Sequence, residues 1–363
     1  MQPPNHYDGI QKPGRGYVNE PADTDGNTYL HLICARGAPL PVVREAVEKL
    51  GADPNVLNKK KTPALAIAIQ KTAPEVVAYL IEKGADIYFP VEKDKFFNAT
   101  HAAVQTGRAD VLQAVLKHGG AAHVQQGGTL DNGYYDDTPP LHAAIQKQYY
   151  HLMEQLVLAG ADVNAEGGYR RQTPLQMATE SEATVPMAQL LRLGADIDAK
   201  ATHEKVTALH LAARGGRLRA LEFLLRKGAD TEALDARGRT PLMAAAEEGQ
   251  PTAIRAILPY VRDIDRRQAG DKHATALMKA AHKGDAACVE ALLKAGANPL
   301  LADDFNKTAA KYAEESPVYQ QNNYRHYDYG YGGGTARAVT LLREAEEKAA
   351  QAFFEKKYKG HRP

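Results

Sequence analysis

The chain has almost no net charge, because 45 Lys and Arg residues stand against 44 Asp and Glu residues and leave a formal charge of +1. A balanced charge gives no global field that favours nucleic acid or an anionic membrane, so electrostatic recognition must come from local patches. The sequence also lacks any uninterrupted apolar run of about 18 residues, and its beginning, from Met1 to Glu20, is polar and rich in Gly and Pro. As written, the sequence predicts a cytoplasmic protein without a membrane span and leaves open export after removal of a leader.

The common catalytic and phosphate-binding motifs are also missing, among them Gly-x-x-x-x-Gly-Lys-Ser/Thr, His-Glu-x-x-His and Gly-x-Ser-x-Gly. The nearest match is the glycine-rich segment 330–334 before an expected helix, where backbone amides could face a phosphate. It lacks the preceding apolar strand of a dinucleotide fold, which favours a helix-entry linker. The sequence therefore predicts no enzyme activity, no cofactor and no metal ion. An enzyme that uses the C-terminal segment as its site is the alternative from a different class.

A pattern of about 34 residues recurs eight times and predicts a repeat architecture. Each copy opens with a sequence like Thr-Pro-Leu-His, continues through small apolar residues and a second apolar stretch, and closes near Gly-Ala-Asp. The copies begin at Thr28, Thr62, Asn98, Pro139, Thr173, Thr207, Thr240 and Thr275, and a worn ninth copy begins at Thr308. The third interval is the longest, so we expect an insertion there, at residues 125–137.

The sixth copy shows why each unit should form two helices. Thr207 has the hydroxyl that caps free backbone amides, and the apolar residues after it form one side of a short first helix that ends at Gly215. A second apolar stripe predicts a second helix, and Gly228 follows it where a left-handed cap is favourable. The stripe consists of Leu218, Leu221, Phe223, Leu224 and Leu225.

Proline and polar residues mark the ends of these helices. We expect Pro63, Pro174 and Pro241 at the first helical position, where a missing amide proton does no harm. Segments between copies, such as 233–239, have the Gly and polar content of a hairpin tip. The segment 23–26 is also interpreted as a hairpin tip, because its spacing does not fit the Asp-x-Asp-x-Asp-Gly pattern of a calcium loop.

These motifs resemble the ankyrin-repeat family. Thr-Pro-Leu-His, Ala-Ala, the leucine stripe and Gly-Ala-Asp recur in register over residues 25–313. The resemblance implies an all-α solenoid of stacked helix-turn-helix units with projecting hairpins, with about eight regular units and a split C-terminal capping unit. It divides the chain into a polar lead-in at 1–24, the repeat domain at 25–313, a Tyr/Gly-rich insertion loop at 314–335, and a capping helix and tail at 336–363.

Two regions depart from the regular pattern. The third unit opens with Asn98-Ala99-Thr100 and has Gly119-Gly120-Ala121-Ala122 in place of Gly-Ala-Asp, so it should be the least regular. At the other end, residues 336–357 combine good helix formers with apolar residues at helical spacing. This segment is expected to be the second helix of a degenerate capping unit. Its apolar residues are Val339, Leu341, Leu342, Ala345, Ala349, Ala352 and Phe353.

The four motif histidines and both cysteines are interpreted as structural residues. His31, His101, His142 and His210 occupy one motif position, at which the resemblance implies a hydrogen bond between neighbouring hairpins. Their regular separation argues against convergence on one metal ion or a shared acid-base role. Cys34 and Cys288 belong to the first and eighth copies, too far apart for a disulfide, and both are interpreted as small core residues.

Three surface segments are candidates for recognition. Lys59, Lys60 and Lys61 are expected on a hairpin tip, either as ordinary solvated charge or as a contact for phosphate or an acidic partner. In the insertion, Tyr134 and Tyr135 could form one Tyr/Arg surface with neighbouring loops, because Tyr and Arg are enriched in binding hot spots. The contributing neighbours would be Tyr149, Tyr150, Tyr169, Arg170 and Arg171, of which Tyr149 and Tyr150 have packing between helices as their alternative role.

The third segment is the tyrosine-rich stretch 316–334. It contains Tyr319, Tyr324, Tyr327, Tyr329 and Tyr331 among Gln, Asn and Gly. This composition fits a tether, a loop that folds on a protein partner, or a nucleic-acid stacking surface. Only Arg325, with His326 when protonated, adds positive charge, so a protein partner is favoured.

The sequence thus predicts a non-enzymatic module that is a monomer when unbound and binds an unidentified protein, with no role for nucleic acid. Hairpin tips, the concave first-helix face and the Tyr-rich insertions should make the contacts. The alternative is an inhibitor or immunity-type protein that occludes the active site of a partner enzyme. The candidate tip residues are Lys93, Lys95, Phe96, Tyr169, Arg170, Arg171, His203, Arg237 and Lys272, those of the first-helix face are Lys147, Arg214, Glu247 and Lys283, and those of the insertions are Tyr134, Tyr135, Tyr324, Tyr327 and Tyr329.

Overall fold

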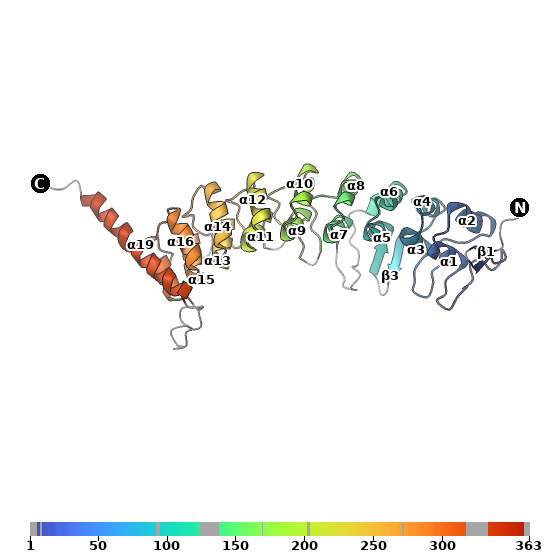
Figure 1. Cartoon of the computed structure of the whole chain (residues 1–363), viewed down its shortest axis with the longest axis horizontal. Coiled ribbons are helices and arrows are strands. Elements are labelled where there is room, and N and C mark those ends of the chain that lie inside the picture. The colour runs from blue at the N-terminus through green and yellow to red at the C-terminus, as the bar shows by residue number, and fades with distance from the viewer. Residues whose placement is uncertain are drawn as a thin grey trace. The chain divides into compact units, whose positions relative to one another are not determined.

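The protein is described here by a computed structural model that is helical along most of its length (Figure 1). The structure describes residues 6–7, 9–91, 95–123, 138–168, 170–201, 204–270, 272–316 and 333–358. The chain divides into two compact units, Met1–Met177 and Ala178–Pro363. We call them unit 1 and unit 2 and describe each by itself.

Unit 1 is built from helix pairs and two small hairpins. Its helices are α1 (Tyr29–Ala35), α2 (Leu40–Arg44) with a π-helical continuation (Glu45–Lys49), α3 (Ala64–Lys71), α4 (Pro74–Glu82), α5 (Ala99–Thr106), α6 (Ala109–Lys117), α7 (Pro140–Gln146) and α8 (Met153–Leu158), with 3-10 turns at Gly120–His123 and Tyr150–Leu152. Strands β1 (His6–Tyr7) and β2 (Ile10–Gln11) form one antiparallel hairpin, and β3 (Tyr88–Val91) and β4 (Lys95–Asn98) form the other, with Tyr88 opposite Asn98.

Unit 2 continues the same alternation of short helices. After α9 (Pro174–Glu180), which spans the division between the units, come α10 (Thr184–Arg192), α11 (Ala208–Arg214), α12 (Leu218–Arg226), α13 (Pro241–Glu248), α14 (Pro251–Ile257) with a 3-10 turn (Leu258–Tyr260), α15 (Ala276–Lys283), α16 (Ala286–Lys294), α17 (Ala309–Glu314) and α19 (Gly333–Tyr358).

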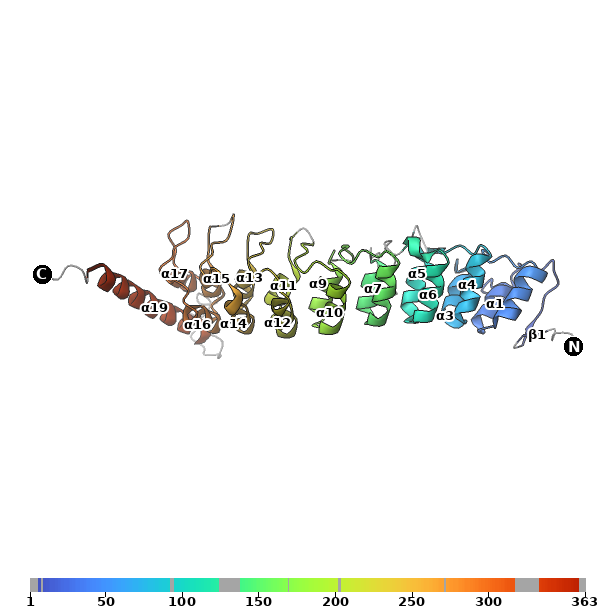
Figure 2. The same ribbon diagram turned by 90° about the horizontal axis from the view of Figure 1, so that it is seen from above.

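Within each unit, like helices stack against like. First helices form one layer in which each contacts the next, in the order α1, α3, α5 and α7 in unit 1 and α11, α13, α15 and α17 in unit 2. Second helices form the other layer in the same way, in the order α2, α4 and α6 in unit 1 and α12, α14 and α16 in unit 2. The loops that precede α13, α15 and α17 project from the same side of the unit 2 helices (Figure 2). This arrangement confirms the predicted all-α stack of helix-turn-helix units with projecting hairpins.

Side-chain caps start the first helices where the sequence predicts them. The hydroxyl oxygens of Thr207, Thr240 and Thr275 each accept a hydrogen bond from the backbone N–H three residues later, at 3.3–3.4 Å. Asn98, which replaces Thr in the third copy, accepts the same bond from His101 at 2.9 Å. Each cap satisfies an amide that the helix itself leaves unpaired.

One of the proline predictions is wrong. Pro174 and Pro241 do begin their helices, but α3 begins at Ala64, so Pro63 is its N-cap residue. Pro63 keeps an extended ψ of 159° because it forms an antiparallel bridge with Leu57 across the hairpin tip. A local pairing across the tip therefore delays the helix by one residue.

The two helix layers enclose a core of small and branched apolar side chains. In unit 2, Leu209, Ala212, Leu221 and Leu224 are all fully buried. Leu218, predicted as part of the same apolar stripe, lies on the first turn of α12 and is 37% exposed. The first position of the predicted stripe therefore contributes less to the core than the later ones.

The last helix, α19, begins at Gly333, a few residues before the expected start. It contacts α16 and α17 and buries Ala338, Val339 and Leu342 against unit 2. The apolar pattern continues beyond this contact, but Phe353 is 60% exposed and Phe354 is 59% exposed. The helical spacing of Phe353 therefore does not place it in the core, because its segment of α19 extends past the helices that cover the first turns (Figure 1).

Replacing Leu221 with Ala should lower the free energy of unfolding by about 2–5 kcal/mol, because it leaves a cavity between the two helix layers. The matched control on the same helix is Leu218→Ala, which should cost less than about 1 kcal/mol because the side chain is partly exposed. Urea unfolding followed by circular dichroism measures both values. Equal losses for the two variants would contradict the assigned burial.

Candidate functional site

The predicted contact residues fall into three groups. Lys95 and Phe96 lie in β4, and the structure does not describe their side chains. Arg170, Arg171, Lys147 and the unit 2 candidates are described. The candidates outside the described residues are Lys93, Tyr134, Tyr135, Tyr169, His203, Tyr324, Tyr327 and Tyr329.

In unit 1, the described candidates lie on different local features. Arg171 is exposed in a hairpin tip with a positive φ of 50°, and its Nε lies 3.2 Å from Glu166 Oε2. Arg170 is exposed next to it. Lys147 is the C-cap residue of α7 and is half-buried. The described part of unit 1 therefore presents the arginine pair on a hairpin tip and Lys147 at the end of a first helix.

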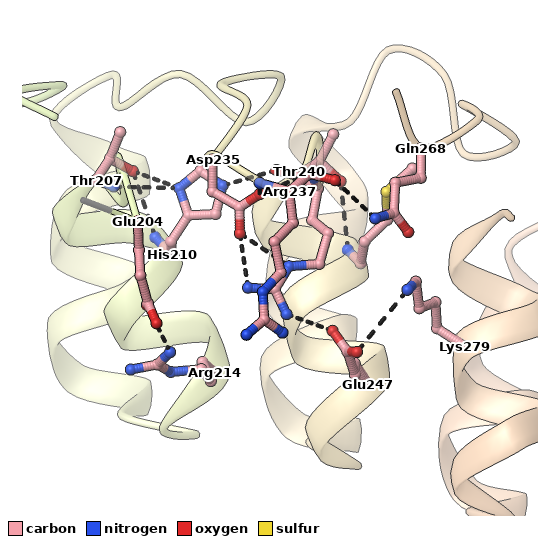
Figure 3. Close-up of polar contacts among 12 residues, drawn as sticks. Glu204, Thr207, His210, Arg214, Asp235, Arg237, Thr240, Glu247, Gln268 and Lys279 are labelled. Carbon is pink, nitrogen blue, oxygen red and sulfur yellow. Dashed lines mark hydrogen bonds and ion pairs between the residues drawn. The ribbon is translucent and has the colours of Figure 1, made fainter. Parts of the chain in front are cut away.

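In unit 2, the candidates gather where hairpin tips meet first helices (Figure 3). Arg214, at the end of α11, pairs with the tip residue Glu204 at 3.3 Å. Arg237 is exposed on the next tip, and Glu247 lies on α13 below it. Lys272, on the following tip, places its Nζ 5.6 Å from the ring centroid of Phe305. Lys283 is exposed at the end of α15.

The tip that carries Arg237 is shaped by a single carboxylate. Asp235 Oδ1 accepts hydrogen bonds from the backbone N–H groups of Arg237 and Arg239, each at 2.9 Å. Asn58 and Asp303 make the same pair of bonds in other tips. A short polar side chain thus replaces the turn that the backbone alone would have to form.

Asp235 has a second role because its other oxygen binds a buried arginine. Asp235 Oδ2 lies 2.7 Å from Nη2 and 2.8 Å from Nε of Arg239. The two side chains are 1% and 6% exposed. Burial acts to raise the pKa of Asp235, but the amide and guanidinium of Arg239 outweigh it, so this pKa is lowered. The carboxylate therefore remains charged inside the tip.

Arg239 also contacts the first-helix face and so connects this ion pair to it. Its Nη1 donates to Glu247 Oε2, and Lys279 Nζ on α15 lies 3.8 Å from Glu247 Oε1 (Figure 3). Burial opposes ionisation of Glu247, but the Arg239 hydrogen bond and the Lys279 charge lower its pKa overall. Alternating charges thus connect the tip and first helix of one repeat to the first helix of the next.

Sequence reasoning missed Arg239. Opposite charges at positions 235 and 239 were a usable signal, since that spacing brings two side chains together across a short tip. It also missed Gln268, whose Nε2 donates to the backbone oxygen of Arg237 at 2.7 Å. The two tips approach closely there: Gly238 has a φ of 71°, and a Cβ at this position would collide with the carbonyl of Ala269.

A pocket of about 280 Å³ lies at this junction of the two tips with α13 and α15. Its charged lining consists of Arg237, Arg239, Glu247 and Lys279, and Gln268 forms part of its wall. The pocket therefore mixes donors and acceptors that are held by the ion pairs described above.

The motif histidines connect neighbouring repeat units, as the sequence predicts. His210 Nε2 donates to the backbone oxygen of Arg239 at 3.0 Å, and its Nδ1 lies 2.9 Å from Thr207 Oγ1. Burial lowers the pKa of His210, which favours the neutral ring. His31, His101 and His142 make the same bond to the carbonyls of Thr62, Thr138 and Gln172.

Both cysteines lie in the core, which confirms their predicted role. Cys34 and Cys288 are fully buried. Burial raises the pKa of Cys34 to about 12, and burial with the nearby Asp285 carboxylate raises that of Cys288. Neither thiol is activated as a nucleophile.

Comparison with known proteins identifies the repeat. The family description "Ankyrin repeats (3 copies)" matches residues 11–90 and 175–268, and "Ankyrin repeat" matches residues 136–167 and 272–304. The chain belongs to the ankyrin-repeat family. Among the described residues of this ankyrin-repeat chain, no helix is both long and apolar enough to cross a membrane.

Several ankyrin-repeat proteins are similar to part of the chain. The B-cell lymphoma 3 protein homolog of Mus musculus is 30% identical over 142 residues, which is 39% of this chain and 30% of that protein. NF-kappa-B inhibitor alpha of Sus scrofa is 30% identical over 146 residues, 39% of this chain and 45% of that protein. The chain thus matches less than half the length of these relatives. The crystal structure of the Bcl-3 ankyrin repeat domain has a TM-score of 0.54 and 23% identity, covers 68% of this chain and 98% of that one, and shares the fold.

Replacing Arg239 with Met should lower the free energy of unfolding by about 3–5 kcal/mol, because it leaves the Asp235 carboxylate buried without its counter-charge. The exposed neighbour provides the control, since Arg237→Met should change stability by less than about 0.5 kcal/mol. Adding Asp235→Asn to Arg239→Met should restore part of the loss. Urea unfolding tests the set, and a loss that is simply additive in the double variant would rule out the coupling.

The buried histidines should make stability depend on pH. The pKa of His210 is lower in the folded than in the unfolded chain, where it is about 6.5, so the unfolded state takes up protons first as pH falls. The contribution of His210 to the free energy of unfolding is therefore fully present above about pH 6.5 and decreases as pH falls through that value.

His210→Gln should weaken this dependence, because Gln176 already occupies the same motif position and carries no titratable group. The measurement is the urea midpoint of both proteins at about pH 7.5 and about pH 5.5, on either side of the unfolded pKa. A midpoint that falls equally in both proteins would mean that His210 does not contribute.

Proposed function

We propose that this chain is a binding module without catalytic activity of its own, and that unit 2 contacts a protein partner through its hairpin tips and first-helix face. The observation that carries this proposal is the fixed row of charged side chains at the tips. Arg214 is held by Glu204, and Glu247 is held between Arg239 and Lys279. Side chains that are already ordered lose less conformational entropy when a partner docks.

The described surface presents hydrogen-bond donors and acceptors. Among the described residues, no group of three or more His, Cys, Asp and Glu side chains is arranged to hold a metal ion. The motif histidines His31 and His210 each use Nε2 for the contact to the next repeat and place Nδ1 beside the N-cap threonine of their own helix. The tips expose Arg237 and Lys272 together with the acidic residues Glu204 and Asp304. Arginine is enriched in binding hot spots.

Three of the relatives support binding as the mode of action. One is named as an inhibitor of NF-kappa-B, and two are B-cell lymphoma 3 proteins. Another relative, the E3 ubiquitin-protein ligase KEG of Arabidopsis thaliana, is an enzyme by name and is matched over 7% of its length. Because the chain matches less than half of these proteins, their partners do not transfer to it. We propose that the Tyr-rich segments add contacts specific to this chain, with Tyr134 and Tyr135 in the insertion at 125–137 and Tyr324, Tyr327 and Tyr329 in the second segment.

Arg214→Ala and Arg237→Ala should each weaken partner binding about tenfold, because both are exposed or half-exposed arginines on the proposed contact face. The partner is first captured from native lysate with the full chain, and its affinity for each variant is then measured by calorimetry. Arg226→Ala, exposed on the second helix α12, is the matched control and should bind normally.

A chain lacking residues 125–137 tests the insertion in the same assay, and it should capture the partner less well. If Arg226→Ala weakens binding as much as the tip variants, the contact face is wrongly assigned. If the captured partner is an enzyme and loses activity in the complex, the inhibitor alternative is favoured over a simple scaffold.

A further inference from the structure

The pocket between the tips of unit 2 contains a buried polar group without a partner. Gln268 is 2% exposed, and its Nε2 is committed to the backbone oxygen of Arg237. That bond fixes which end of the side-chain amide is the oxygen. Within the described residues, Gln268 Oε1 accepts no hydrogen bond. A buried acceptor in this state is costly, so it indicates a place where a donor from outside belongs.

The position of this oxygen connects it to the pocket. Gln268 forms part of the pocket wall together with Lys279 and Glu247. In Figure 3 the amide oxygen of Gln268 is directed to the side on which the Lys279 ammonium and the Glu247 carboxylate lie. The pocket of about 280 Å³ thus offers an acceptor at Gln268 and a donor at Lys279 to the same occupant.

The charges around the pocket decide which class of group fits. A carboxylate would be attracted by Lys279 and Arg237, but its oxygens would face the oxygen of Gln268, which needs a donor. A guanidinium or ammonium could donate to Gln268, but it would meet the three cations that line the pocket. A neutral amide avoids both conflicts, because its N–H donates to Gln268 Oε1 while its C=O accepts from Lys279.

We infer that this pocket binds a neutral amide group of the protein partner, supplied by an Asn or Gln side chain or by a backbone peptide group. The inference rests on the proposed function, since it names the chemistry that the first-helix face recognises. It makes the pocket a determinant of specificity, because a partner without the amide would leave Gln268 unpaired on binding.

Three small probes of the same shape and different charge test the inference on the full chain. They are acetamide, acetate and acetamidinium, which are neutral, negative and positive. Binding is followed by the backbone amide NMR signals of Ala269 and Gly270, which line the pocket. Acetamide should produce saturable shifts and bind at least about threefold more tightly than either ion, because only it matches both polar groups. N-methylacetamide distinguishes the two sources, since a backbone peptide group corresponds to that secondary amide.

Lys279→Met should weaken acetamide binding about fivefold, because it removes the donor to the carbonyl, while Lys279→Arg should largely retain binding. Lys294→Met, exposed on the second helix α16 and outside the pocket lining, is the control and should bind acetamide normally. The urea midpoint of Lys279→Met, compared with that of the unchanged chain, shows whether a loss of binding reflects the missing donor or a failure to fold.

Tighter binding of acetate or acetamidinium than of acetamide would overturn the inference, and so would the absence of a saturable shift with acetamide. These outcomes are separable from failure of the proposed function. If acetamide fails while Arg237→Ala still weakens the captured partner, the contact face stands and only the amide specificity falls.

Discussion

Neighbouring repeats are joined by hydrogen bonds to the carbonyl that lies just before each first helix. His31 donates to Thr62, and His210 donates to Arg239, in each case to the residue that precedes the N-cap of the next first helix. The bond is buried, so a shift in the stacking of two neighbouring repeats would leave a polar group unpaired in the core. The register of the first helices joined in this way, and the position of the hairpin tips that carry the acceptor carbonyls, depend on this constraint.

Arg239 also connects the register of the repeats to the charged surface. Arg239 accepts from His210 and from the N–H of Asp235 through its backbone, while its side chain binds Asp235 and Glu247. Where Met243 and Met278 replace histidine, backbone bonds between tips maintain the connection, as from Ala269 to Gly238. The residues that connect the repeats and the candidate contact residues therefore overlap.

The pocket at Gln268 is a consequence of that packing. Two tips approach closely enough to exclude a side chain at Gly238, which buries Gln268 and commits its amide nitrogen to Arg237. Its oxygen then faces the space above Lys279 and Glu247. A scaffold that repeats one fold can thus acquire a specific site where two successive tips differ from the regular pattern.

The sequence by itself determined the repeat, the two helices of each repeat and the threonine cap, because each depends on spacing within one or two adjacent repeats. The resemblance to the ankyrin-repeat family implied the connecting role of the histidines. It did not reveal that Pro63 is held outside its helix, that Leu218 and Phe353 remain exposed, or that Arg239 is buried while Arg237 is not. Only the tertiary structure decided these points. The side chains of the neighbouring repeat decide whether a charged or apolar side chain in a tip or at a helix end is buried. Local periodicity contains no information about that neighbour.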